Sequence, residues 1–274
     1  MSLESRRTRH VGDPRLLRAL FDLKDGIRLW RLWSMLGWVD IRQRYRRAFI
    51  GPFWLAISMG VMVCGMGLVY GTLFNQDMSS FLPFVAGGLI AWVYISSTML
   101  DAASAFTQAE GLIKQGGLPQ SIHLFRVIWR NLIVLAHNSV VIIGIYIWRQ
   151  DFPWASLYLV VPALILVTMN VAWIAFVIGP VCTRFRDAHQ IITNVVQILF
   201  LLTPILYKPE LLKHYTWIID LNPFSYMVDA IRDPLLGRGL SISLTAILLS
   251  TAIVGWTVAL LLFARTRGRI AYWL

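Results

Sequence analysis

Charged side chains are scarce in this 274-residue chain. Asp, Glu, Lys and Arg together make up 14% of the residues, whereas hydrophobic residues make up 57%, and the mean hydropathy is +0.64. An ordinary soluble domain is about one quarter charged, and most of the surface of a globule must face water. The composition therefore excludes an ordinary water-soluble fold, and we expect a membrane protein.

Cysteine is also rare, and both copies lie in apolar runs. We interpret Cys64 and Cys182 as small hydrophobic residues, and we expect neither a disulfide scaffold nor a metal site. An apolar signal sequence is missing from residues 1–28, which are polar and rich in arginine. We therefore expect no cleaved signal peptide.

The motifs of an enzyme active site are missing as well. The chain has no Gly-x-x-x-x-Gly-Lys-Ser/Thr loop for nucleotide phosphates, no carboxylate pair on one face of an apolar run, and no histidine at ligand spacing from a second histidine or a cysteine. We expect no catalytic residue and no cofactor in this chain. A gradient-driven carrier should contain acids inside its spans, so we expect energy from a separate ATPase.

The polar residues inside the apolar runs have a simpler interpretation than catalysis. In membrane helices, such side chains usually form hydrogen bonds with a neighbouring helix. We expect this of five residues: Asn131, His137, Asn170, Asn194 and Gln197.

Six apolar runs are long enough, or nearly so, to cross a bilayer. A spanning helix needs about 20 residues, because the hydrocarbon core is about 30 Å thick. The runs are 51–74, 84–100, 127–148, 157–182, 191–207 and 242–263, of which the second and fifth are short. The sequence therefore predicts an all-α integral membrane protein with six spans.

Lysine and arginine are distributed unevenly over the connecting segments. One side, which includes the N-terminal region, carries twenty of the 25. The other side carries Arg149, Lys208, Lys213, Arg232 and Arg238. Because segments rich in these residues stay in the cytoplasm, we expect both termini inside. The net charge of +11 then lies at the membrane surface, and we expect no nucleic-acid partner.

Residues 29–47 precede the first span and resemble an interface helix. On a helical wheel, Leu29, Trp30, Trp33 and Leu36 lie opposite several arginines, which is typical of a helix in the membrane plane. Asp40 and Arg44 interrupt the apolar side and could pair, being one turn apart. A solvated basic helix is the alternative.

Residues 208–241 fit neither a span nor a simple loop. They contain two apolar patches, and Pro223 and Pro234 should break any long helix. We predict two short helices that form a re-entrant hairpin or lie at the outer interface. A plain periplasmic loop is the alternative.

Small residues occupy one side of the first span. They are Gly60, Cys64, Gly67 and Gly71, and this spacing permits close contact with another helix. A homodimer with a conduit between two copies is a reasonable hypothesis.

Four motifs carry a resemblance to a known family. In chain order they are RYRRAFIGPFW at 44–54, AEGLIKQGGLP at 109–119, LNPFSYMVDAIRDPLLG at 221–237 and RIAYWL at 269–274. In this order and topology they resemble the permease subunits of type-2 ABC exporters for lipid-linked polysaccharides, which serve O-antigen, capsule and teichoic-acid export. The resemblance covers one transmembrane domain, 29–274. Residues 1–28 carry no feature of the family, and we interpret them as a polar cytoplasmic N-terminus.

The resemblance implies an ATPase partner in two copies, which binds ATP and Mg²⁺, beside two copies of this chain. Two segments would contact the ATPase: a coupling helix between the second and third spans, and the loop after the fourth. Their residues are Glu110, Gly111, Leu112, Ile113, Lys114, Leu118, Pro119, Arg184, Phe185, Arg186 and Asp187. Ordinary positive-inside loops are the alternative.

The resemblance also implies residues that handle substrate. Arginines of the interface helix would bind the pyrophosphate-lipid headgroup, since guanidinium binds phosphate in a bidentate manner: Arg31, Arg42, Arg44, Arg46 and Arg47. Aromatic faces would stack on sugar rings along the translocation path, unless they serve as belt or packing residues: Phe53, Trp54, Tyr70, Trp92 and Tyr94. Asn222, Pro223 and Phe224 mark the re-entrant region.

Three function classes remain. The first is export of lipid-linked polysaccharide across the bacterial inner membrane, with more similarity to the O-antigen branch, and hence to lipopolysaccharide biosynthesis, than to the capsule branch. The second is a type-2 permease for a drug or simple lipid. The third is a membrane-embedded transferase.

Overall fold

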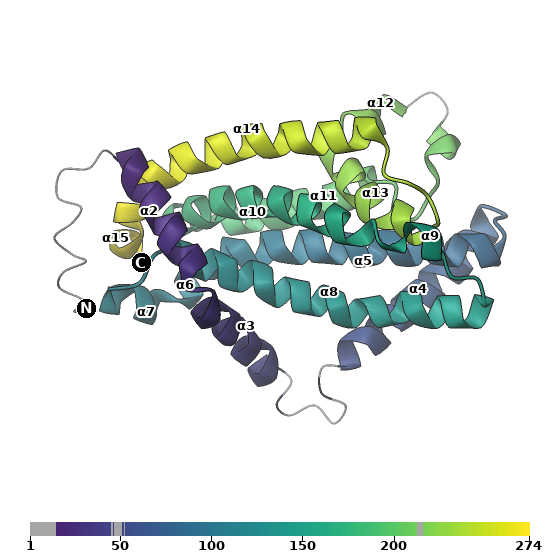
Figure 1. The fold of residues 1–274 in the computed structure, drawn as a ribbon, viewed down its shortest axis with the longest axis horizontal. Helices are drawn as coiled ribbons and strands as arrows, with labels where there is room; N and C mark the ends of the chain where they lie inside the picture. Colours follow the sequence, from purple (N-terminus) through teal and green to yellow (C-terminus); the bar gives the residue numbers. More distant parts are fainter. Residues whose placement is uncertain (1–14, 45, 47–50, 52, 213–215) are drawn as a thin grey trace.

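The computed structural model of this chain describes residues 15–44, 46, 51, 53–212 and 216–274, and this part contains helices but no strand (Figure 1). The helices are α2 Arg15–Arg28, α3 Trp30–Arg44, α4 Phe53–Leu73, α5 Met78–Ala103, α6 Ala105–Gln108, α7 Glu110–Gln115, α8 Ser121–Arg149, α9 Trp154–Leu157, α10 Val160–Arg184, α11 Ala188–Leu202, α12 Thr216–Asp220, α13 Pro223–Leu235, α14 Ile242–Thr266 and α15 Ile270–Trp273. Short 3₁₀ turns cover Pro209–Leu212 and Arg267–Arg269.

The prediction of an all-α membrane protein is confirmed. Within the described residues, five helical segments are long and apolar enough to cross a bilayer: Phe53–Leu73, Met78–Ala103, Ser121–Arg149, Trp154–Arg184 and Ile242–Trp273. They overlap five of the six predicted spans.

The predicted fifth span, 191–207, is shorter than the sequence suggested. Its helix, α11, ends at Leu202, and its 15 residues reach about 22 Å, less than the hydrocarbon core of about 30 Å. The helix stops because Thr203 precedes Pro204, and a residue before proline is pushed out of the helical region. Thr203 accordingly has an extended backbone, with φ −91° and ψ 133°. The count of six spans stays a prediction.

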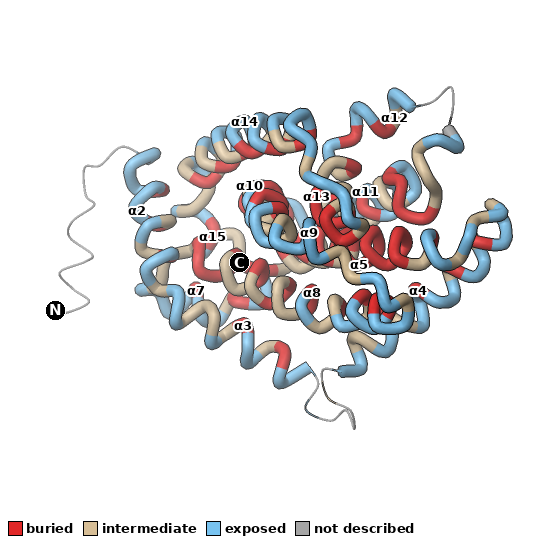
Figure 2. Tube along the Cα trace, turned by 45° about the vertical axis from the view of Figure 1, so that its right-hand side comes forward, coloured by how far each residue is buried: buried red, intermediate tan, exposed pale blue. Residues whose placement is uncertain are grey.

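Helix α5 lies at the centre of the bundle. It packs against α4, α8, α10, α11 and α13. In the 18-residue apolar stretch of each helix, 72% of the residues are buried for α5, against 17% for α4 and 28% for the segment that contains α14. Figure 2 shows the same division, with buried positions concentrated on α5, α10 and α13 and exposed ones along α4 and α14. Thus α4 and α14 present their apolar surfaces outward.

The segment before the last span contains the two predicted short helices, α12 and α13. Pro223 occupies the first turn of α13 and Pro234 its last turn, so the prolines coincide with the ends of a helix rather than interrupt it. Helix α13 packs against α5, α10 and α14 and so lies among the long helices. Whether this pair re-enters the membrane stays a prediction.

The small residues of the first span contact helices of the same chain. A Cβ at Gly67 would lie 2.6 Å from Leu82 Cδ1, and one at Gly71 would lie 2.7 Å from Met78 Sδ. The predicted close helix contact therefore exists, but its partner here is α5. The homodimer stays a prediction.

A second glycine contact gives a testable packing prediction. A Cβ at Gly255 on α14 would lie 2.2 Å from the ring of Trp173, whose Nε1 donates to Asn170 Oδ1 at 3.2 Å and so fixes the ring. Gly255→Ala should cost about 1–3 kcal/mol through overpacking. The matched control is Gly144→Ala on α8, where no described atom lies within 4 Å and which should gain about 0.5–1 kcal/mol. Melting temperatures of the purified full chains test this, and equal shifts would contradict the predicted contact.

Candidate functional site

An ion-pair network joins the interface helix α3 to two long helices. Arg126 Nε donates to Asp40 Oδ2 at 2.7 Å, and Arg130 Nη1 lies 3.3 Å from the same oxygen. Arg130 Nη2 lies 2.8 Å from Asp101 Oδ2 on α5, as an ionic contact without hydrogen-bond alignment. Asn131 Nδ2 also donates to Asp101 Oδ2, at 2.8 Å. The network runs from α3 through α8 to α5, so α3 cannot separate from the bundle without breaking ion pairs.

This network corrects the expected pairing of Asp40 with Arg44. Asp40 bonds instead across to α8, and Arg44 lines a cavity. The predicted apolar face of α3 is partly covered within the chain, since Trp30 is 55% exposed whereas Trp33 is packed. Trp33 packs on Phe125 and Trp129 of α8, with ring centroids 6.0 Å apart in both pairs. Contact with α8 therefore decides which face of α3 is covered.

A cavity of about 330 Å³ lies between the end of α3 and helices α4, α5 and α8. Its polar lining residues are Arg44, Ser58, Ser97, Asp101, Asn131 and Asn138. Asn138 is buried, and its Oδ1 has no hydrogen-bond partner among the described residues. An unsatisfied buried amide costs about 1–3 kcal/mol, so a ligand with a donor group would be favoured here.

The interface-helix arginines do not form a single cluster. Arg31, Arg42, Arg44 and Arg46 are exposed, and Arg31 lies 5.6 Å from the ring centroid of its neighbour Trp30. Of the four, Arg44 lines the cavity between α4, α5 and α8. Arg47 lies outside the described residues.

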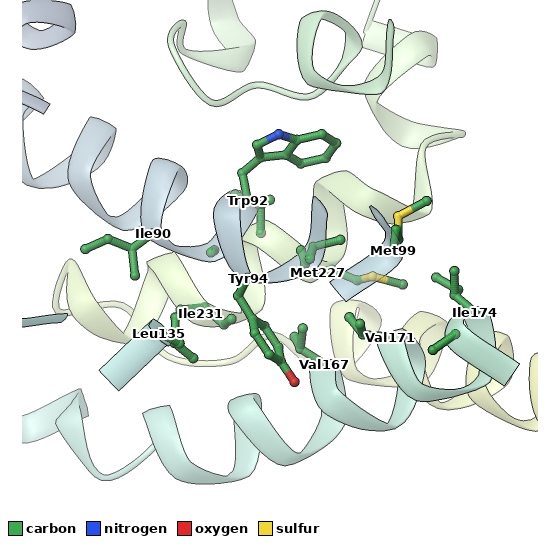
Figure 3. Packing of buried hydrophobic residues seen from close by; sticks show 14 of the residues in the cluster. Ile90, Trp92, Tyr94, Met99, Leu135, Val167, Val171, Ile174, Met227 and Ile231 are labelled. Carbon is green, nitrogen blue, oxygen red and sulfur yellow. The ribbon is translucent and has the colours of Figure 1, made fainter. Parts of the chain in front are cut away.

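The five aromatic residues predicted for the translocation path are not brought together. Phe53 and Trp54 are exposed on α4, whereas Trp92 and Tyr94 are buried. Figure 3 shows the last two leaving α5 on opposite sides. Tyr70 is half-buried beside Phe74, with ring centroids 5.8 Å apart.

Trp92 and Tyr94 each have packing partners within the chain. The ring centroid of Trp92 lies 5.9 Å from that of Phe200 and 6.3 Å from that of Phe224. Tyr94 Oη and Thr168 Oγ1 are 2.9 Å apart. Within one chain, both residues therefore have the packing role that the sequence left open.

The re-entrant motif Asn222-Pro223-Phe224 fixes the start of α13. Asn222 Oδ1 accepts from the backbone N–H of Phe224 at 3.0 Å, and Asn222 Nδ2 donates to Thr203 Oγ1 at 2.9 Å. Pro223 has no backbone N–H, but in the first turn of a helix this group would have no intrahelical acceptor. The motif thereby ties α13 to the end of α11.

Arg232 is a buried cation that the charge count placed on the outer side of the membrane. It is 2% exposed, donates from Nη1 to Pro204 O at 2.6 Å, and forms an ion pair with Asp229. Its guanidinium carbon lies 4.0 Å from the ring centroid of Phe84 on α5. The sequence signal for this ion pair was Asp229, which lies three positions before Arg232 and so on the same side of a helix. A buried cation among apolar helices is a functional candidate.

The polar residues expected to bond between helices divide into two groups. Asn170 donates to Leu248 O on α14 at 3.0 Å, as predicted, and Asn131 reaches α5. For the others the expectation is wrong within the described chain: His137 bonds to Ile133 O on its own helix, and Asn194 and Gln197 are exposed on α11.

The two segments predicted to contact an ATPase lie at one end of the bundle, beside the C-terminus (Figure 1). On α7, Leu112 is 36% exposed whereas Ile113 is 5% exposed, and Glu110 pairs with Lys114. Gly111 is exposed, and the helix ends at Gly116, whose φ of +74° favours glycine.

The second segment, residues 184–187, is exposed throughout. The Arg184 guanidinium carbon lies 5.1 Å from the ring centroid of Phe185 and 5.6 Å from that of Trp273. Arg186, Glu110 and Trp273 line a second cavity of about 330 Å³ between the two segments. Asp187 immediately precedes α11, while Leu118 and Pro119 lead into α8 and are half-buried. The structure therefore brings both predicted segments together.

Known proteins resemble this chain over the region that holds the ion-pair network and the cavity beside Arg44. Residues 31–236 match the ABC-2 type transporter family. Two proteins from Klebsiella pneumoniae, each named O-antigen export system permease protein RfbA, are 22% identical to it over 237 residues, which cover 85% of this chain and 90% of each relative. A protein of the same name from Myxococcus xanthus is 25% identical over 170 residues, 61% of this chain and 65% of that relative. Because the family match covers most of the chain, from α3 to α13, the chain belongs to the ABC-2 type transporter family.

Proposed function

We propose that this chain is the transmembrane subunit of an exporter that moves lipid-linked polysaccharide of the O-antigen type across the bacterial inner membrane. The observation that carries this proposal is the family match together with relatives named O-antigen export permeases, aligned over 85% of the chain. The sequence has no phosphate-binding loop, so a separate ATPase binds ATP and Mg²⁺.

The ATPase docks at the end of the bundle that carries α7 and residues 184–187. Support comes from the exposed apolar side chains of Leu112 and Phe185, which are 36% and 56% accessible. Helix α2 and the C-terminus lie at the same end (Figure 1), and the excess of Lys and Arg on this side supports a cytoplasmic location.

A second copy of the chain covers α11 in this proposal. Asn194 and Gln197 are exposed on α11, and polar side chains facing lipid are costly. By contrast, the exposed large residues of α14, such as Ile253, Val254 and Val258, are apolar. We therefore assign α14 to lipid, and the α11 side to the dimer and its conduit.

The cavity beside Arg44 receives the head of the lipid-linked substrate. Arg44 supplies a cation that suits a pyrophosphate, and the unpaired Asn138 Oδ1 accepts a sugar hydroxyl. The ion pairs of Asp40 then connect a change at the interface helix to α5 and α8.

Co-purification with a candidate ABC ATPase, followed by ATP turnover in nanodiscs, tests the proposal. We expect a complex of two permeases and two ATPases whose turnover rises with added lipid-linked glycan. Delipidated glycan and a glycan-free lipid carrier serve as controls. The proposal is wrong if no complex forms. Turnover that responds to drugs or simple lipids but not to glycan would also contradict it, and would favour a type-2 permease for a drug or simple lipid.

A further inference from the structure

Helix α2 carries large apolar side chains that the other described residues leave exposed. Its buried positions are Ala19, Asp22 and Gly26, which face the bundle. The large apolar side chains Leu16 and Leu20 are 45% and 43% exposed. The helix lies across the end of α14 (Figure 1). A helix with an uncovered apolar side and adjacent cations is typical of the membrane surface.

Asp22 fixes this helix in place. Its carboxylate accepts hydrogen bonds from the backbone N–H groups of Gln120 and Ser121 at 3.1 and 3.0 Å, at the start of α8. It also pairs with Arg267 Nη2 at 3.1 Å, just after α14. A Cβ at Gly26 would lie 2.2 Å from Ser121 Oγ, so the two helices touch. The position of α2 is therefore set by specific contacts.

Five arginines from the two ends of the chain surround one cavity of about 230 Å³. Helix α2 supplies Arg15 and Arg18, and the end of α14 with the turn after it supplies Arg265, Arg267 and Arg269. No acidic residue is among the described residues that line it. Pockets for drug-sized ligands are larger, at about 300–1,000 Å³, so this one suits a small group.

The cavity gathers positive charge from both segments. Asp22 pairs with Arg267, whose buried Nε has no acceptor in the described part of the chain. Like charges held this close repel, and guanidinium binds phosphate oxygens in a bidentate manner. An anion with phosphate chemistry would stabilise the arrangement.

We propose that this arginine pocket binds the phosphate of an anionic membrane phospholipid, such as phosphatidylglycerol or cardiolipin, and so anchors α2 and the end of α14 at the membrane surface. The uncovered apolar side of α2 favours a lipid over a soluble anion, because acyl chains can cover it. Basic pockets between membrane helices bind such headgroups elsewhere. The pocket shares no lining residue with the cavity beside Arg44, so the inference is independent of the exported substrate.

The test is lipid binding to the full chain in detergent, followed by native mass spectrometry during titration with phosphatidylglycerol or phosphatidylcholine. The pocket variant is Arg15→Gln/Arg265→Gln/Arg269→Gln, which keeps Arg267 and its partner Asp22. The matched control removes three exposed cations that do not line the pocket, Lys24→Gln/Arg28→Gln/Arg238→Gln.

Each arginine should contribute about fivefold to the affinity for phosphatidylglycerol, so the pocket variant should bind this lipid about 100-fold more weakly. The control variant should bind it nearly as well as the unaltered chain, and phosphatidylcholine binding should be the same in all three proteins. A loss under tenfold, or an equal loss in the control, overturns the proposal. Displacement of the lipid by inorganic phosphate at equal concentration would overturn the lipid assignment in favour of a soluble anion.

If the variant does not fold, a photoreactive phosphatidylglycerol is cross-linked to the unaltered chain. Adducts within 15–21 or 264–269 support the pocket, and adducts confined to other segments overturn it.

Discussion

Replacing Arg130 by alanine should destabilise the protein by about 3 kcal/mol, because the change leaves the partly buried carboxylate of Asp101 without its cation. Arg130 is 6% exposed and lies between Asp40 and Asp101. Asp40 keeps Arg126, but Asp101 keeps only the amide of Asn131. Thermal unfolding of the purified chain measures the loss. Part of it should return in Arg130→Ala/Asp101→Asn, since the second change removes the uncompensated charge.

The matched control for this prediction is Arg149→Ala on the same helix. Arg149 lies 3.4 Å from Asp151, whose side chain is 75% exposed, and surface pairs contribute about 0–1 kcal/mol. If Arg130→Ala and Arg149→Ala lower the melting temperature equally, the network does not hold α3, α5 and α8 together. Failure of the double variant to recover any stability would show that Asp101 is not the group left unpaired.

The long helices were predictable from sequence because hydrophobicity alone sets them. Lipid requires about 20 apolar residues per span, and five such runs became long helices. Their ends were less predictable. The run 191–207 remains apolar past Thr203, but Pro204 ends the helix there through backbone sterics. A hydropathy profile reports the polarity of side chains and contains no information on this steric restriction.

The site was predictable only where the residues lie near one another in the chain. The coupling segment on α7 and the residues around Arg184 were identified as motifs, and the structure places them together. The pairing of Asp40 with Arg126 spans 86 positions, and no periodicity reports such a contact. Arg232 was counted on the outer side because charge counting assumes that a cation outside a span faces water. Its burial depends on Pro204 and Phe84, which come from other segments.

Residues 15–28 show a signal that sequence reasoning missed. They carried no feature of the resembled family and were interpreted as a polar N-terminus. Their apolar residues nevertheless recur at helical spacing, with Leu16, Leu20 and Ile27 all exposed and Ala19, Asp22 and Gly26 buried. Small residues facing the bundle and large ones facing outward indicate a docked helix in the membrane surface.

Replacing Leu112 by aspartate should separate the permease from its ATPase without unfolding it. The side chain is exposed on α7, beside the second contact segment, and a charge there would oppose an apolar contact. Loss of a central interface residue costs about 2 kcal/mol or more, which is about a 30-fold loss of affinity. Affinity between detergent-solubilised permease and ATPase measures the loss, and transport-coupled ATP turnover should fall with it.

The neighbouring variant Ile113→Asp is the comparison that makes this prediction specific. Ile113 is buried in the core cluster, so a carboxylate there should destabilise the fold by roughly 3 kcal/mol. The same substitution at two adjacent positions should therefore have different effects. Leu112→Asp should leave the melting temperature unchanged and weaken ATPase binding, whereas Ile113→Asp should lower the melting temperature. Leu112→Ala, which removes the apolar contact without adding charge, should give an intermediate affinity. If Leu112→Asp binds the ATPase as well as the unaltered chain does, α7 is not the docking helix, and residues 184–187 would have to hold the ATPase without it.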